Sequence, residues 1–71
     1  MISYKPLWKT LKTKGLKKQY LVDHGINKAT MDRLNHDKNI TTRTLDDICM
    51  IVKVPVNEVI ECKWNDLSNK F

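Results

Sequence analysis

The side chains best suited to binding chemistry lie between residues 27 and 35 of this 71-residue chain. Met31 and Leu34 are three residues apart, as on the packed side of a helix. The neighbouring positions are small, polar or cationic: Lys28, Ala29, Thr30 and Arg33. Such a set packs poorly, but its donors can form hydrogen bonds with base edges in a groove. The pattern predicts a helix with one side packed and the other side free to bind.

Catalytic and metal-binding chemistry has little support in the sequence. His24 and His36 have no carboxylate or cysteine at metal-ligand spacing, which favours surface or capping roles. Cys49 and Cys62 fit neither a disulfide framework nor a zinc site. The sequence has no nucleophile elbow, phosphate-binding glycine loop or HExxH motif. We therefore expect no enzymatic activity, no metal and no cofactor.

The net charge of +5 is unevenly distributed along the chain. Residues 1–44 contain ten Lys and Arg against three Asp, whereas residues 45–71 contain three Lys against five acidic residues. Such asymmetry is typical of a surface that faces a polyanion, and nucleic acid is the commonest one. A solvated surface that keeps a small protein in solution is the alternative, and charge alone does not decide between them.

Composition predicts one compact domain. The chain is 41% hydrophobic and 30% charged, with 2 Gly and 2 Pro, unlike a disordered chain. No apolar run reaches the roughly 20 residues of a membrane helix, and the N-terminus does not resemble a signal peptide. We expect a single domain over residues 1–71 in the cytoplasm, with its core at about 4–61 and residues 62–71 as a tail or dimer contact.

The elements that must position residues 28–33 are short helices. Pro6 can begin a first helix over residues 6–14, which Gly15 ends. A second helix over residues 17–24, with Tyr20 and Leu21 inward, stops at Gly25. The third covers residues 28–35, with Asn27 as its N-cap.

Two further helices and a ribbon are expected after residue 40. Helical periodicity is clearest over residues 42–53, where apolar side chains repeat at i, i+3, i+4 and i+7: Leu45, Ile48, Cys49 and Val52. Pro55 opens a short fifth helix containing Val56, Val59 and Ile60. Residues 61–64 could pair with residues 1–4 as a weak two-stranded ribbon. The predicted fold is all-α with five helices and a short terminal β-ribbon.

The spacing of apolar residues fits a helix-turn-helix. When Lys17 is the first of twenty motif positions, Gly25 is the ninth, Ile26 the tenth, Met31 the fifteenth and Leu34 the eighteenth. These are the turn glycine and the apolar residues that hold the two helices together. The second helix of such a motif enters the major groove of DNA.

The chain resembles the small phage-Cro and repressor-like (Cro/C1-type) helix-turn-helix regulators of bacteria, phages and mobile elements. The resemblance covers about residues 4–61. Beyond the turn at Gly25 and Ile26, it includes residues 7–8, 15–16, 39–42, 45–49 and 55–61. Leu21 departs from the pattern, since the wider superfamily favours Ala at the close contact between the motif helices. The resemblance implies a five-helix, lambda-repressor-like DNA-binding domain with helix 28–35 as the reader.

Candidate DNA contacts fall into two groups. The base-reading candidates are Asn27, Lys28, Thr30 and Arg33, because Arg can bridge guanine O6 and N7 and Asn can pair with adenine. The phosphate-binding candidates open the second helix or flank the loop after the third. They are Lys17, Lys18, Gln19, Lys38, Asn39 and Arg43. A solvated cationic face is the alternative interpretation of the second group.

The leading functional hypothesis is a sequence-specific DNA-binding transcriptional regulator that represses by occupying its operator. One short reading helix covers only a few base pairs, so we expect a homodimer on a palindromic site in double-stranded DNA. The fifth helix and residues 61–71 are the candidate dimer contacts. We expect no membrane or small-molecule partner. The alternative is a protein-interaction module, antitoxin-like or an adaptor, because one scaffold can host several functions.

Overall fold

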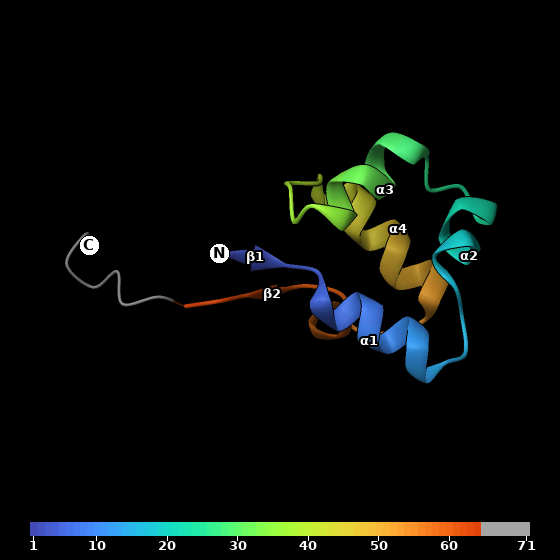
Figure 1. Cartoon of the computed structure of the whole chain (residues 1–71), viewed down its shortest axis with the longest axis horizontal. Coiled ribbons are helices and arrows are strands. Elements are labelled where there is room, and N and C mark those ends of the chain that lie inside the picture. Colours follow the sequence, from blue (N-terminus) through green and yellow to red (C-terminus); the bar gives the residue numbers. More distant parts are fainter. Residues whose placement is uncertain (65–71) are drawn as a thin grey trace.

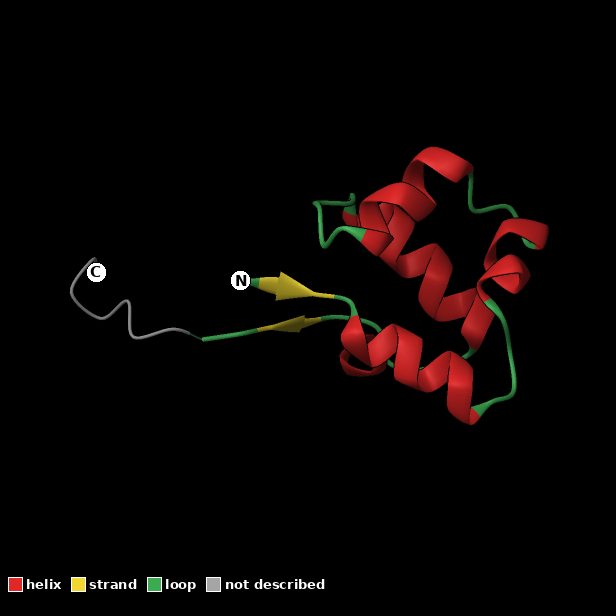
Figure 2. Ribbon diagram, viewed as in Figure 1, coloured by secondary structure: helices red, strands yellow, loops and turns green. Residues whose placement is uncertain are grey.

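The computed structural model describes residues 1–64 (Figure 1). Its elements, in chain order, are β1 (Ile2–Ser3), α1 (Lys5–Thr13), α2 (Lys18–Asp23), α3 (Lys28–Asn35), α4 (Thr42–Val52), the 3-10 turn η1 (Val56–Glu58) and β2 (Glu61–Cys62). Helix α3 has the predicted bounds, and the ends of the other three α-helices lie within one residue of prediction. Figure 2 shows the helices gathered in one body from which the two strands project.

The predicted fifth helix is wrong, because residues 56–58 form a single 3-10 turn. Helix α4 ends at Val52, its C-cap residue Lys53 has a left-handed φ of 62°, and Pro55 follows in an extended conformation. Three β-branched residues, Val56, Val59 and Ile60, then disfavour a longer helix. The chain becomes extended at β2 directly afterwards, so within residues 1–64 the fold has four α-helices and one small sheet.

The predicted terminal ribbon is confirmed. Strands β1 and β2 pair antiparallel, with Ile2 opposite Cys62 and Ser3 opposite Glu61. The ribbon continues by one residue, because the Lys63 N–H donates to the Met1 carbonyl at 2.6 Å. The Met1 ammonium donates in return to the Lys63 carbonyl, also at 2.6 Å. The first and last described segments of the chain are thus held side by side.

All four helices contribute apolar side chains to one core. The buried residues include Leu7 and Leu11 of α1, Leu34 of α3, and Ile48 and Val52 of α4. Val59, directly after η1, is also fully buried, so the segment that follows α4 contributes a side chain to the core. In Figure 1, α4 runs between α1 and α3.

Leu21 and Tyr20 of α2 have different environments. Leu21, which departs from the family pattern, is fully buried in the core. Tyr20 was expected inside but is only half-buried, and its ring lies 4.1 Å from that of His24, centroid to centroid. Helix α2 therefore buries Leu21 fully but Tyr20 only in part, whereas the sequence predicted that both would face inward.

Tyr4 connects the N-terminal segment to the loop after α3. Its N–H donates to Oδ1 of Asp37 at 3.1 Å, and its hydroxyl donates to the Lys38 carbonyl at 2.6 Å. Burial, and secondarily the charge of Asp37, raises the pKa of Tyr4. Asp37 itself has a φ of 53°. This loop is therefore fixed to the core on the side from which Lys38 projects.

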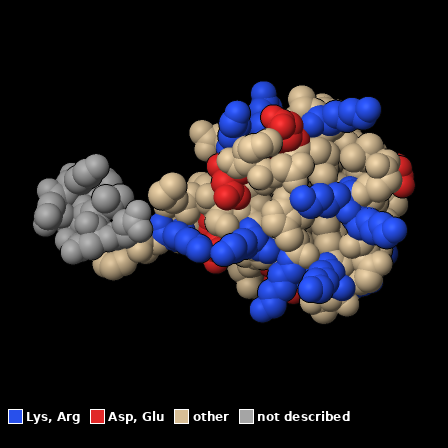
Figure 3. All heavy atoms as spheres, viewed as in Figure 1, with Lys and Arg blue, Asp and Glu red and all other residues tan. Residues whose placement is uncertain are grey.

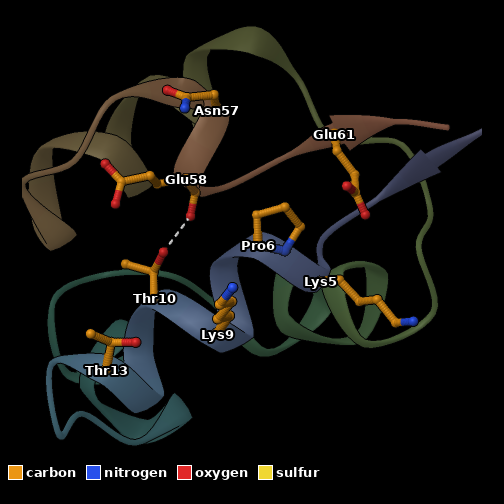
Figure 4. Close-up of a pocket in the computed structure, with 8 residues that line it drawn as sticks. All are labelled: Lys5, Pro6, Lys9, Thr10, Thr13, Asn57, Glu58 and Glu61. Carbon is orange, nitrogen blue, oxygen red and sulfur yellow. Dashed lines mark hydrogen bonds between the residues drawn. The ribbon is translucent and has the colours of Figure 1, made fainter.

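Thr10 connects α1 to η1. Its hydroxyl donates to the Glu58 carbonyl at 2.7 Å (Figure 4). Around this bond lies a shallow hollow of about 520 Å³, whose lining includes Lys5, Lys9, Glu58 and Glu61. The hydroxyl of Thr10 thus holds α1 against η1 through a hydrogen bond.

Candidate nucleic-acid interface

Helices α2 and α3 are joined by a tight turn over residues 24–27. Gly25 has a φ of 107°, a conformation that residues with a Cβ rarely adopt. Ile26 follows it, is buried, and donates its N–H to the Leu21 carbonyl at 3.0 Å. Asn27 then caps α3, since its Oδ1 accepts the Thr30 N–H at 2.8 Å. These local interactions fix where α3 begins and how it leaves α2.

Helix α3 has one packed side and one exposed stripe. Met31 and Leu34 are buried. Successive residues of a helix are rotated by about 100°, so the opposite side is defined by positions 29, 32, 33 and 36. All four residues there are exposed: Ala29, Asp32, Arg33 and His36. We call these four residues the α3 stripe.

The four predicted base-reading residues differ in position. Arg33 lies on the α3 stripe, and Lys28 is exposed between this stripe and α2. Thr30 is half-buried at the other margin of the helix. Asn27 is exposed, but its Oδ1 already forms the cap of α3. Its amide group is the part of the side chain without a capping role.

Asp32 and His36 were missed as candidate site residues. Nδ1 of His36 lies 3.3 Å from Oδ1 of Asp32, one helical turn apart. Their side chains, a carboxylate and an imidazole, are neither cationic like Lys and Arg nor N-caps like Asn27. Their position could have identified them, because helical periodicity places both residues on the side of α3 opposite Met31 and Leu34.

The start of α2 supplies fewer uncommitted donors than predicted. Lys17 is the exposed N-cap residue of α2. The Lys18 ammonium lies 2.6 Å from Oδ1 of Asn35 and 4.3 Å from the centroid of the Trp8 ring. Gln19 donates from Nε2 to Oδ1 of Asp23 at 2.9 Å. Lys18 and Gln19 would have to share or exchange these partners to bind a phosphate.

A second hollow, also of about 520 Å³, lies between α2 and α3. Its lining includes Lys18, Gln19 and Lys28, and also Asp32. It therefore brings two predicted phosphate contacts beside one predicted base contact. An anionic backbone laid across this hollow would meet donors from both helices of the motif, but it would also lie near the Asp32 side chain.

The remaining predicted phosphate contacts follow α3. Lys38 and Asn39 are exposed in the loop that Tyr4 anchors, and Arg43 is exposed in the first turn of α4. Thr41 caps α4 by accepting the Thr44 N–H at 3.1 Å. Arg43 lies in the first turn of α4, where the positive end of the helix dipole also favours an anion. Figure 3 shows Lys and Arg side chains spread over much of one face of the helical body.

Residues 1–64 contain neither a metal-binding cluster nor a membrane-spanning helix. Within them, no group of three or more His, Cys, Asp and Glu side chains could hold a metal ion. In the same part of the chain, every helix is too short or too polar to cross a membrane.

Comparison with known proteins agrees with this geometry. The crystal structure of the transcriptional regulator VanUg is similar, with 28% sequence identity and a TM-score of 0.82, over 90% of this chain and 87% of that one. No curated protein sequence matches significantly. Residues 6–64 match the Cro/C1-type helix-turn-helix DNA-binding domain. Because this match spans most of the chain, the protein belongs to the family of Cro/C1-type helix-turn-helix DNA-binding domains.

Proposed function

We propose that this protein is a sequence-specific transcriptional regulator that represses by occupying its operator. The observation that carries the proposal is the α3 stripe, an exposed polar surface on a helix whose other side is fixed in the core. Membership of a DNA-binding family and similarity to a transcriptional regulator support it. In this proposal α3 enters the major groove, where Arg33, Lys28, Thr30 and the Asn27 amide meet base edges.

The proposed backbone contacts lie on either side of α3. Lys17, Lys18 and Gln19 would meet phosphates at the start of α2, and Lys38, Asn39 and Arg43 would meet those beyond the following loop. Such contacts supply affinity and register but no sequence information. They also make binding strongly salt-dependent, because each neutralised phosphate releases counterions.

The proposed assembly on DNA is a homodimer. Helix α3 has 8 residues and can reach only a few base pairs, so selectivity calls for two half-sites about one helical turn apart. The β1–β2 ribbon supports a contact between protomers, since Trp64 at its end is 83% exposed and Met1 is 78% exposed. Residues 65–71, the other part of the predicted contact, lie outside the described residues.

The proposed role is binding without catalysis or a cofactor, in the cytoplasm. Neither the α3 stripe nor the hollow beside it contains a nucleophile with an adjacent base. Occupancy of DNA would then be the whole activity of the domain.

Selection of bound duplexes from a random DNA pool tests the proposal. The selected duplex and a scrambled control are then titrated at about 50 mM and 200 mM salt. A palindromic winner that binds about 10³-fold more tightly than the scramble, with a steep salt slope, is the expected result. Equal and weak binding of both duplexes would contradict it and favour the protein-interaction module.

A further inference from the structure

The carboxylate of Asp32 has an unusual position for a polyanion-binding surface. Its side chain is 64% exposed and lies on the α3 stripe next to Arg33. Among residues 1–64, Nδ1 of His36 lies 3.3 Å from its Oδ1 and 2.8 Å from the Asp32 backbone carbonyl oxygen, and no Lys or Arg of this part forms a salt bridge with the carboxylate. A negative charge thus remains on the surface expected to approach DNA.

The chemistry of an ionised carboxylate limits what it can meet in a groove. It only accepts hydrogen bonds, and phosphates repel it. In the major groove, guanine and thymine present only acceptors as their polar groups, while cytosine N4 and adenine N6 supply donors. Asp typically accepts from cytosine N4. An acid on the reading helix therefore has few favourable positions on a DNA sequence.

We propose that Asp32 is a specificity-determining residue that selects cytosine in each half-site. This inference rests on the proposed function, because it requires α3 to lie in the major groove. Arg33 is the next residue on the same stripe and can bridge O6 and N7 of guanine. Together Asp32 and Arg33 select a cytosine with a guanine opposite or adjacent to it.

Exclusion of other bases is the main effect of Asp32. Where the base offers no donor, the carboxylate loses water without gaining a partner, and that raises the free energy of the complex. Specificity then comes from a penalty against wrong sequences as well as from a contact with the right one. Removing the carboxylate should strengthen binding to sequences that lack the cytosine.

Two substitutions at position 32 test the proposal. D32A removes the acceptor, and D32N replaces it with a group that pairs with adenine. E58Q is the matched control, since it also removes one negative charge, and the Glu58 side chain lies in the hollow beside α1 (Figure 4). Circular dichroism confirms that each variant keeps its helices. Each variant is used to select duplexes from the random pool. Each is also titrated with the duplex that the wild type selects and with a second duplex in which the C·G pair is changed to T·A.

We expect the wild-type protein to prefer the C·G duplex by about tenfold or more. D32A should reduce this ratio to near one by binding the T·A duplex more tightly, and D32N should select adenine at this position. E58Q should raise both affinities by the same factor and leave the ratio unchanged. If D32A selects the same bases as the wild type at every position, the role of Asp32 is overturned while the proposed function stands. If the wild type itself selects no sequence, both are overturned.

Discussion

The Lys18 ammonium lies 2.6 Å from the carboxamide oxygen of Asn35, the last residue of α3. The same ammonium lies 4.3 Å from the centroid of the Trp8 ring of α1. One side chain at the start of α2 thus contacts both neighbouring helices. Lys18 was predicted as a phosphate contact, and its position also gives it a role in holding α3 against the core.

Replacing Lys18 with Met should lower the free energy of unfolding by about 0.5–1 kcal/mol, because it removes a cation–π contact and a surface hydrogen bond. Urea denaturation, followed by Trp8 fluorescence in a W64F background, measures the change. K17M is the control, since Lys17 is exposed at the neighbouring position. Equal stability of the two variants would show that the Lys18 contacts contribute nothing measurable.

The capping role of Asn27 can be separated from its proposed contact with DNA. N27D keeps an oxygen for the Thr30 N–H, so its stability should match the wild type, whereas N27A should lose about 1 kcal/mol. N27D also removes the amide donors, so it should weaken any preference for adenine in the selected operator. Denaturation and duplex titration measure the two effects. A loss of stability in N27D would mean that the cap needs the neutral side chain.

Arg33 and Arg43 should respond differently to substitution by Ala. R33A should relax sequence preference at one position by about 1–3 kcal/mol, because Arg33 lies on the α3 stripe. R43A should weaken binding to all duplexes alike and reduce the slope of log affinity against log salt by about 1. Titrations with operator and scrambled duplexes at several salt concentrations distinguish the two patterns. The reverse assignment would place α4, not α3, in the groove.

The hydrogen bond from Thr10 to the Glu58 carbonyl should stabilise the domain. T10V keeps the shape of the side chain but leaves the carbonyl without this donor, which should cost about 1–2 kcal/mol of unfolding free energy. T13V is the control in the same helix, because Thr13 is exposed and should change stability by less than about 0.5 kcal/mol. Thermal and urea denaturation provide the comparison, and similar losses in both variants would contradict a role for this bond.

Tyr4 should make stability depend on alkaline pH. Its pKa is raised in the folded state above the ordinary value of 10.0, first by burial and then by Asp37, so the neutral phenol is favoured on folding. This contribution is fully present below pH 10 and is lost as the pH rises through the raised folded value. The difference in unfolding free energy between wild type and Y4F should therefore shrink above about pH 10.

Urea denaturation of both proteins between pH 8 and pH 12 measures this difference. All other ionisable groups are shared by the two proteins, so their contributions cancel in the comparison. A constant difference across the range would show that the Tyr4 phenol is not preferentially neutral in the folded state.

Helix α3 was predictable because its signals are local. Asn27, Met31 and Leu34 are close in sequence, and a cap followed by an i, i+3 apolar pair is sufficient to place a helix. The fifth helix was wrong because Pro55 signals a helix start, while the β-branched residues after it disfavour a helix. Asp32 was missed because its negative charge does not suggest a contact with DNA, and only its position in the helix does.

Contacts between distant residues could not be predicted from the sequence. The Lys18 ammonium meets Trp8 and Asn35 only after three helices have packed, and no local pattern encodes that meeting. The same holds for Tyr4 with the loop at Asp37 and Lys38. The candidate site was therefore predictable in its location, but the partners that compete for its side chains were not.

The pairing of Met1 with Lys63 sets an order of events when the chain is made on the ribosome. Translation releases the N-terminal strand first, yet its partner emerges only after nearly the whole domain has been synthesised. The helices, whose contacts are mostly local, can form while synthesis continues, and closing the two ends is entropically the more costly step. The nascent strand β1 therefore remains an unpaired edge until residues 61–63 have left the ribosome.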